Sequence, residues 1–266
     1  GVVIAFQNFK PAKGLTGSKW VGFKHFIDFF DGPYAWRLIR NTLLLSFYQI
    51  LIGFPAPILL ALLFNEMRGK RYKRVCQTLT YVPHFVSLVV VCGLIRTFTS
   101  STGLITSLFV RFGMEKMNLL AQPQYYRTIY VLSGVWQNIG WGSIIYLATL
   151  SNVDPSLFEA ADLDGANRLQ KILHINLPML IPIIAVQLIM RVGRIMSEGS
   201  EKTILLYSAV TYDTSDIISS YVYRTGLEKR SYSPAAAIGL FNSLINLLML
   251  FVVNAISKKV TETSLW

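Results

Sequence analysis

Charged residues are scarce in this chain. Only 15% of its 266 residues are Asp, Glu, Lys or Arg, and 53% are hydrophobic, whereas about 25% of an ordinary soluble domain is charged. This composition excludes a disordered protein and argues against a water-soluble globular enzyme. The chain has only two cysteines, Cys76 and Cys92, and each lies in or beside an apolar run. A disulfide scaffold and a cysteine-ligated zinc site are therefore disfavoured.

Motifs for nucleotide binding and for common hydrolytic chemistry are also missing. The sequence contains no G-x-x-x-x-G-K-[ST] run, no H-E-x-x-H and no G-x-S-x-G. We therefore predict that the chain is not an enzyme and binds no metal or cofactor itself. The formal net charge is +11, but Lys and Arg lie between apolar runs rather than on one stripe. A nucleic-acid partner is accordingly not expected.

Five stretches lack every charged residue and are close to the length that crosses a hydrocarbon core of about 30 Å. They are residues 43–64, 78–95, 128–153, 175–190 and 235–256. Backbone groups in lipid must be hydrogen-bonded within their own segment, which favours helices. The pattern predicts an all-α, polytopic membrane protein. Because the chain begins with Gly1 in an apolar run, we expect a further hydrophobic segment before it.

The distribution of positive charge predicts the orientation of these spans. The short segment 65–77 contains five cations between Arg68 and Arg74, which is typical of a cytoplasmic loop. Alternation then places residues 151–177 in the cytoplasm and residues 197–234 outside. The outer segment is rich in tyrosine, which would either anchor it at the membrane interface or meet a partner.

The polar stretch 151–178 carries signals for a short helix. Asp154 followed by Pro155 is typical of an N-cap with proline at the first helical position; alternatively, Ser156 is the cap and Glu159 closes a capping box. Gly165 can end the helix in the left-handed conformation. So short a helix has little stability alone, and the residues leave open whether it meets a partner protein or lies on lipid.

The same stretch resembles the EAA loop of permease subunits of bacterial ABC importers. Residues 159–161 are EAA, residues 164–166 are DGA, and I-N-L-P at 175–178 is followed by Pro182. One departure is Ile172, where many sugar permeases have Phe. Nearly the whole chain is similar to the maltose-type carbohydrate permeases, and most similar to those of the alginate or rhamnogalacturonan type. The supporting stretches are residues 5–6, 20–23, 41–42, 83–87, 140–148 and 236–240.

The resemblance implies an ABC importer type I permease fold, with five membrane helices visible and a sixth before residue 1. Residues 1–266 would form a single transmembrane domain in the bacterial cytoplasmic (inner) membrane and translocate oligosaccharides by alternating access. The implied partners are a second permease subunit, an ABC ATPase dimer that holds ATP and Mg, an extracytoplasmic substrate-binding protein and the lipid bilayer. Contact with the ATPase would involve Leu157, Glu159, Ala160, Ala161, Asp164, Gly165 and Ala166.

Polar and aromatic residues at membrane depth are candidates for the substrate pathway, because polar groups are costly there unless they face a cavity or another helix. The candidates are His84, Trp136, Gln137, Asn138, Trp141, Gln187, Arg191 and Arg194. Aromatic rings beside amides suit sugars, although an interfacial aromatic belt or contacts between helices would explain the same residues. Arg191 and Arg194, three residues apart on one face, would suit an acidic oligosaccharide, or they snorkel or pair with Glu198 and Glu201.

An ion-coupled secondary transporter or channel is the alternative function. Such a protein would need buried acidic groups or broken helices that hold ions. None of the five uncharged stretches contains Asp or Glu, and the EAA loop would then have no role.

Overall fold

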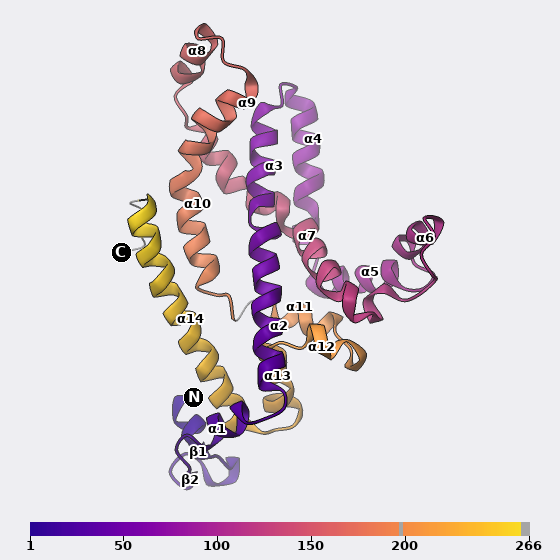
Figure 1. Cartoon of the computed structure of the whole chain (residues 1–266), viewed down its shortest axis with the longest axis vertical. Coiled ribbons are helices and arrows are strands. Elements are labelled where there is room, and N and C mark those ends of the chain that lie inside the picture. Colours follow the sequence, from indigo (N-terminus) through magenta and orange to yellow (C-terminus); the bar gives the residue numbers. More distant parts are fainter. Residues whose placement is uncertain (197–198, 262–266) are drawn as a thin grey trace. The chain divides into compact units, whose positions relative to one another are not determined.

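The computed structural model describes residues 1–196 and 199–261, and helices make up most of it (Figure 1). The chain forms two compact units, each built from three separate stretches of sequence. The first unit comprises Gly1–Phe47, Leu88–Tyr130 and Val192–Leu250, and the second comprises Tyr48–Ser87, Val131–Arg191 and Phe251–Trp266. Helices α2, α7, α10 and α14 begin in one unit and end in the other.

The first unit contains mostly short elements. They are η1 (Val2–Phe6), β1 (Gln7–Asn8), η2 (Pro11–Lys13), β2 (Lys19–Trp20), α1 (Lys24–Phe30), most of α2 (Ala35–Tyr48), α5 (Leu88–Thr99), α6 (Leu104–Arg111), η5 (Leu119–Ala121), the start of α7 (Pro123–Ser151), α11 (Ser200–Leu206), η7 (Ala209–Thr211), α12 (Tyr212–Ser215), α13 (Ile218–Tyr223), η8 (Arg224–Glu228) and most of α14 (Tyr232–Thr261). Strands β1 and β2 form an antiparallel pair in which Gln7 lies opposite Trp20. The backbone N–H of Phe9 donates to Ser233 Oγ at 2.9 Å, which fixes this hairpin to the first turn of α14.

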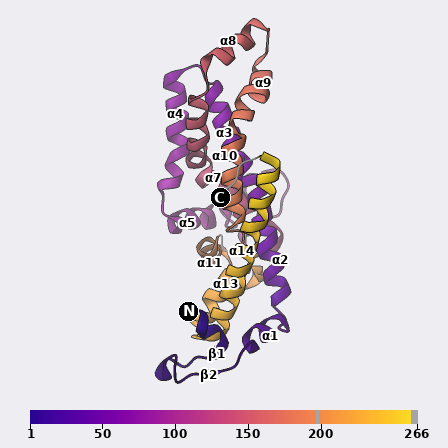
Figure 2. The same cartoon turned by 90° about the vertical axis from the view of Figure 1, so that its left-hand side faces the viewer.

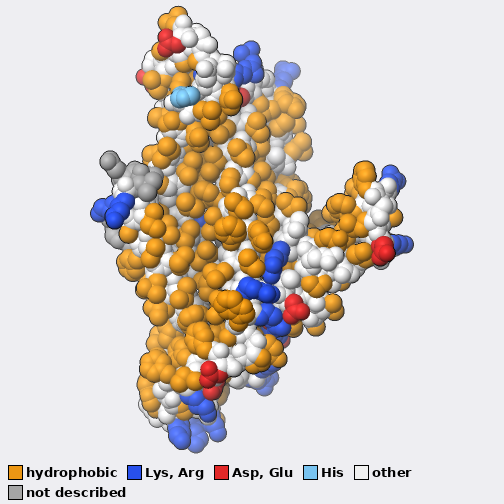
Figure 3. Space-filling view, viewed as in Figure 1, with side chains coloured by type: hydrophobic (Ala, Val, Ile, Leu, Met, Phe, Trp, Pro, Cys, Tyr) orange, Lys and Arg blue, Asp and Glu red, His pale blue; other side chains and the backbone are white. Residues whose placement is uncertain are grey.

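The second unit is a bundle of longer helices. Its elements are η3 (Gln49–Gly53), α3 (Pro55–Glu66), α4 (Lys70–Tyr81), η4 (Val82–Phe85), most of α7, α8 (Pro155–Leu163), α9 (Arg168–Lys171), η6 (Ile172–Asn176) and α10 (Leu177–Val192). On the face shown in Figure 3, hydrophobic side chains cover α3 and α10. This is the surface expected of helices in contact with lipid.

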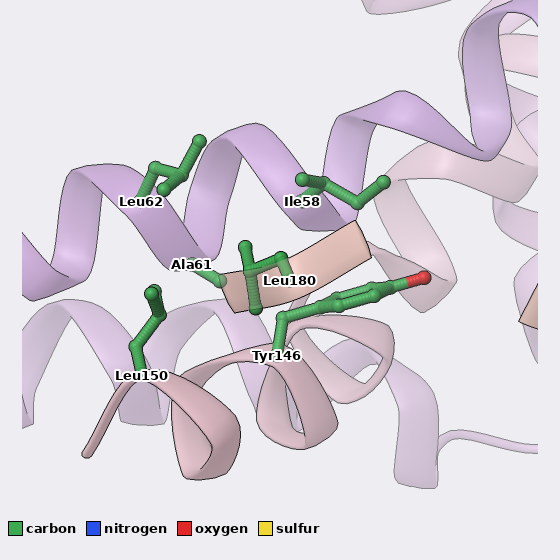
Figure 4. Packing of buried hydrophobic residues seen from close by; sticks show 6 residues of the cluster. All are labelled: Ile58, Ala61, Leu62, Tyr146, Leu150 and Leu180. Atoms are coloured by element: carbon green, nitrogen blue, oxygen red, sulfur yellow. The ribbon is translucent and has the colours of Figure 1, made fainter. Parts of the chain in front are cut away.

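The core of the second unit is formed where α3, α7 and α10 meet. Figure 4 shows Ile58, Ala61 and Leu62 of α3 packed against Tyr146 and Leu150 of α7 and Leu180 of α10. Helix α7 approaches its neighbours closely because it has glycine at the contacts. A Cβ atom at Gly140 would lie 2.1 Å from the carbonyl oxygen of Thr80. In lipid, the hydrophobic effect does not drive helices together. Small residues at helix crossings let the backbones approach closely, and the resulting van der Waals contacts stabilise the packing.

The predicted membrane spans agree with the helices in most places. Within the described residues, four helical stretches are long and apolar enough to cross a membrane: Ala35–Glu66, Leu88–Arg111, Arg168–Val192 and Tyr232–Lys259. Three of them contain the predicted spans 43–64, 175–190 and 235–256. The third predicted span, 128–153, falls on α7, a 29-residue helix that is less apolar than those four because it carries residues such as Gln137 and Asn138.

The second predicted span, 78–95, is wrong in its bounds. Helix α4 ends at Tyr81, a 3₁₀ turn follows from Val82 to Phe85, and the next helix starts only at Leu88. Pro83 has no N–H to continue an α-helix, so the uncharged run is divided between two helices.

Candidate functional site

Helix α8 begins at an aspartate cap. The side chain of Asp154 accepts a hydrogen bond from the backbone N–H of Ser156 at 2.9 Å, and Pro155 is the first helical residue. Hydrogen bonds from the backbone and side chain of Ser156 lower the pKa of this carboxyl. The first of the two predicted caps is therefore confirmed, and the alternative with Ser156 as cap and Glu159 closing a box is wrong.

The other end of α8 is closed by a glycine turn. Gly165 has φ +74°, as predicted, and open space surrounds the position of a Cβ atom. The N–H of Ala166 donates to the carbonyl of Ala161 at 2.9 Å, and the N–H of Gly165 to that of Asp162 at 3.1 Å. These two bonds form a Schellman motif, which satisfies carbonyls that the helix end leaves unpaired.

The segment that follows holds α8 in place. Asn167 and Gln170 form a reciprocal capping box at the start of α9. Lys171 of α9 makes an ion pair with Asp162 of α8. Because the two short helices are capped and linked, the loop has a defined conformation although neither helix is long enough to be stable alone.

The surface of α8 is open. None of its residues is buried, and it extends beyond the ends of α3 and α4 within the second unit, as both views show (Figures 1 and 2). Glu159, Ala160, Asp164 and Gly165 are exposed, whereas Ala161 and Ala166 are half-buried. Leu157 is 46% exposed, and Leu163, which sequence reasoning missed, is 91% exposed. Exposed apolar side chains such as Leu157 and Leu163 are typical of a surface that meets a protein partner.

Three of the predicted pathway residues come together where η4 meets α7. The rings of His84 and Trp141 stack with their centroids 4.7 Å apart and 3° between their planes. His84 Nδ1 lies 3.1 Å from Asn138 Oδ1, and Phe85 contacts Trp141 edge-on. We call His84, Asn138 and Trp141 the aromatic–amide cluster. Trp141 as a whole remains 49% exposed.

The remaining pathway candidates have different surroundings. Gln137 is buried, and its side-chain amide donates to the carbonyl of Val86 at 3.4 Å. Trp136 is exposed and Gln187 is half-buried on α10. Arg191 lies in the last turn of α10, where its guanidinium donates to Gln49 Oε1 at 3.4 Å.

The predicted shared helix face of Arg191 and Arg194 is wrong. Helix α10 ends at Val192, so exposed Arg194 belongs to the turn beyond it. Glycine at position 193 favours such an ending. Of the acidic partners considered for these arginines, Glu198 lies outside the described residues.

Sequence reasoning missed a buried ion pair in the polar segment that is predicted to lie outside. Asp216 is fully buried, and its carboxylate accepts hydrogen bonds from Arg224 at 2.7 Å and from Ser220 at 2.8 Å. The Arg224 guanidinium lies 4.6 Å from the ring centroid of Tyr212 and 5.6 Å from that of Tyr207. Some of the tyrosines noted in the sequence therefore enclose an arginine. The spacing of eight residues between the two charges gave no signal for this contact.

Comparison with known proteins identifies the family. Residues 43–262 match the family model described as "Binding-protein-dependent transport system inner membrane component". The whole chain is 42% identical to the polygalacturonan/rhamnogalacturonan transport system permease protein YteP of Bacillus subtilis and 40% identical to Protein LplB of the same organism, covering 83% and 84% of them. A crystal structure of a bacterial ABC transporter that imports the acidic polysaccharide alginate is similar with a TM-score of 0.91 and 42% identity, over 98% of this chain and 88% of that one.

This chain belongs to the family of binding-protein-dependent transport system inner membrane components. The predictions of a multi-pass inner-membrane protein, of the ABC importer type I permease fold and of a permease subunit of an ABC importer for sugars are confirmed. Its predicted partners, a second permease, an ATPase and a substrate-binding protein, are those of this family. The secondary transporter or channel considered as the alternative is not favoured.

Proposed function

We propose that this permease carries acidic oligosaccharides across the membrane by alternating access, with ATP and Mg bound on the ATPase subunits. The observation that supports this substrate class is the similarity of the chain to two transport proteins for uronate-containing polymers. These are YteP and the alginate importer, and the chain is 42% identical to each. A formal net charge of +11 also favours attraction of a polyanion. The chain itself performs no covalent chemistry in this proposal and holds no cofactor.

The aromatic–amide cluster is the part of the pathway that contacts sugar rings. Trp141 offers an exposed face, and stacking with His84 holds it in one orientation. The apolar C–H face of a pyranose packs on such a ring, while the amide of Asn138 can bond hydroxyl groups. Trp136, Gln137 and Gln187 would line neighbouring positions, and Arg191 and Arg194 would bind carboxylates, for which the guanidinium fork is suited.

Helix α8 is the contact with the ATPase in the cytoplasm. Its caps keep it rigid, so that a displacement imposed by the ATPase reaches α9 and α10 instead of bending the loop. Leu157, Ala160, Ala161 and Ala166 would form the apolar contact, because small side chains permit close approach. Glu159 and Asp164 would bind cations of the ATPase, and Gly165 sets the turn that directs the helix.

The test is uptake by the complete importer reconstituted in proteoliposomes with its ATPases and binding protein. We expect ATP-dependent uptake of a trigalacturonate to exceed uptake of the carboxyl-reduced, neutral trimer. Substituting Arg191→Gln together with Arg194→Gln should reduce this preference. Equal rates for the two trimers, unchanged in the double variant, would contradict the proposed substrate class.

A further inference from the structure

The first unit contains a pocket that the predicted pathway does not include. It has a volume of about 170 Å³ and lies between α5, η5 and α11. Helices α5 and α11 contact each other there. Its polar lining comes from Arg96, Asn118, Tyr207 and Ser208, and its apolar lining from Leu120, Ala121 and Leu206. A pocket of this size has room for one sugar ring of a longer chain.

Arg96 has the geometry of an anion-binding side chain. The residue is exposed, and its Nε donates to the carbonyl oxygen of Leu205 at 2.8 Å, which orients the guanidinium. Within the described part of the chain, Arg96 makes no ion pair, although it lines the pocket. The two terminal nitrogens therefore remain for a ligand, and together they match the two oxygens of a carboxylate.

The other polar groups of the pocket are also oriented by neighbours. The side-chain oxygen of Asn118 accepts from the N–H of Leu120 at 3.1 Å, which leaves its amide nitrogen to donate elsewhere. The ring of Tyr207 packs against that of Tyr212 with 5.2 Å between centroids. No residue lining the pocket is acidic, so nothing there repels an anion.

We propose that this pocket is a subsite for one uronate unit of the oligosaccharide, in which Arg96 pairs with the sugar carboxylate. Asn118 donates to a hydroxyl group, and the edge of Tyr207 contacts the sugar ring. The inference rests on the proposed function, because it assumes an acidic substrate. It adds a recognition point on the first unit, separate in sequence from the aromatic–amide cluster of the second.

The experiment uses the purified importer, permeases with ATPases, in nanodiscs without the binding protein. Binding of trigalacturonate and of galactotriose is measured by saturation-transfer difference NMR titration. Arg96→Gln should weaken the binding of trigalacturonate about tenfold, since hydrogen bonds to charged groups contribute that much, and should leave galactotriose unchanged. Glutamine can still donate to Leu205, so the variant removes the charge and keeps the anchor. Arg111→Gln, an exposed arginine on α6 outside the pocket, is the matched control.

Other outcomes would overturn the proposal. If Arg96→Gln and Arg111→Gln bind trigalacturonate equally, or if Arg96→Gln weakens both trimers alike, the pocket does not recognise a carboxylate. Ala121→Phe, which fills the pocket, gives a second test should Arg96→Gln fail to assemble, and unchanged binding of trigalacturonate would again reject the subsite. If uptake still favours trigalacturonate while any of these results is found, the proposed function stands and only the subsite is rejected.

Discussion

Two polar segments join membrane helices in this protein, and they use their charges in opposite ways. In residues 199–234, which are predicted to lie outside and are called the outer segment, Asp216 is fully buried and accepts hydrogen bonds from Arg224 and Ser220. In the loop 151–178, no residue of α8 is buried, and the cap of Asp154 is itself exposed. The first segment buries a charge and pairs it with cations of the same chain, Arg224 and Arg37, whereas the charges of α8 stay at the surface.

The physical reason lies in the cost of burial. A buried carboxylate must be paired and hydrogen-bonded, so the environment of Asp216 is closed by its own chain. Exposed charges carry no such requirement, and α8 needs only caps and the Lys171–Asp162 ion pair to keep its shape. Substitutions in the outer segment should therefore affect stability, and those in the loop should affect transport.

The largest effect is expected from Arg224→Met. Without Arg224, the buried carboxylate of Asp216 keeps only Ser220 and the more distant Arg37, whose guanidinium lies 3.6 Å away. Breaking a buried ion pair costs up to about 3–5 kcal/mol. The thermal unfolding midpoint in detergent should fall sharply, measured by intrinsic fluorescence. Lys229→Met, at an exposed position nearby, should leave the midpoint close to that of the parent. If neither substitution changes the thermal midpoint, the buried ion pair does not stabilise the protein, and the proposed difference between the two segments is wrong.

Glu159→Arg should lower transport without lowering stability. Placing a cation where the ATPase is expected to offer cations costs several kcal/mol at an interface, so ATP-dependent uptake should fall at least about tenfold. The thermal midpoint should not change, because Glu159 is exposed. Glu228→Arg, an exposed charge reversal in the outer segment, is the control. Full uptake by Glu159→Arg would show that this carboxylate has no role in coupling.

Gly165→Val should have a smaller effect on uptake. The residue has φ +74°, and a side chain in this conformation costs about 1–2 kcal/mol. Such a cost corresponds to a factor of about 5–30 in the population of the native turn. Asparagine tolerates the left-handed region, so Gly165→Asn should retain most of the uptake. Equal activity of the two variants would mean that the turn does not have to be maintained.

The smallest effect concerns the cap of α8. Because the pKa of Asp154 is lowered, its contribution is present above the ordinary carboxyl pKa of about 3.9 and is lost only as the pH falls through the lowered value. The protection of α8 amides from hydrogen exchange should therefore show no loss of the cap between pH 6 and 8, after correction for the intrinsic rate. Asp154→Ala should exchange faster than the parent, and Asp154→Asn should lie between them.

Features that depend on neighbouring residues could be predicted from the sequence, whereas features that depend on tertiary packing could not. The Asp154 cap and the Gly165 turn depend on residues within one helical turn, so they could be predicted. The division of 78–95 into two helices was not predicted, because a proline such as Pro83 can either bend a helix or end it, and the sequence does not show which of the two the packing favours. His84 and Trp141 were both predicted as pathway residues, but their stacking was not predicted, because the two residues are distant in sequence. Asp216 and Arg224 were missed because their pairing depends on how α13 and its neighbours pack.

The central claim is that the exposed surface of α8 meets the ATPase, and site-directed crosslinking tests it most directly. Ala160→Cys is introduced in a background where Cys76 and Cys92 are replaced by serine, and a short thiol-to-amine crosslinker is added to the assembled importer. We expect one product, containing the permease and the ATPase, and none from Ser231→Cys in the outer segment. Efficient ATP-driven uptake with no permease–ATPase product from Ala160→Cys, or equal yields from both positions, would contradict the account.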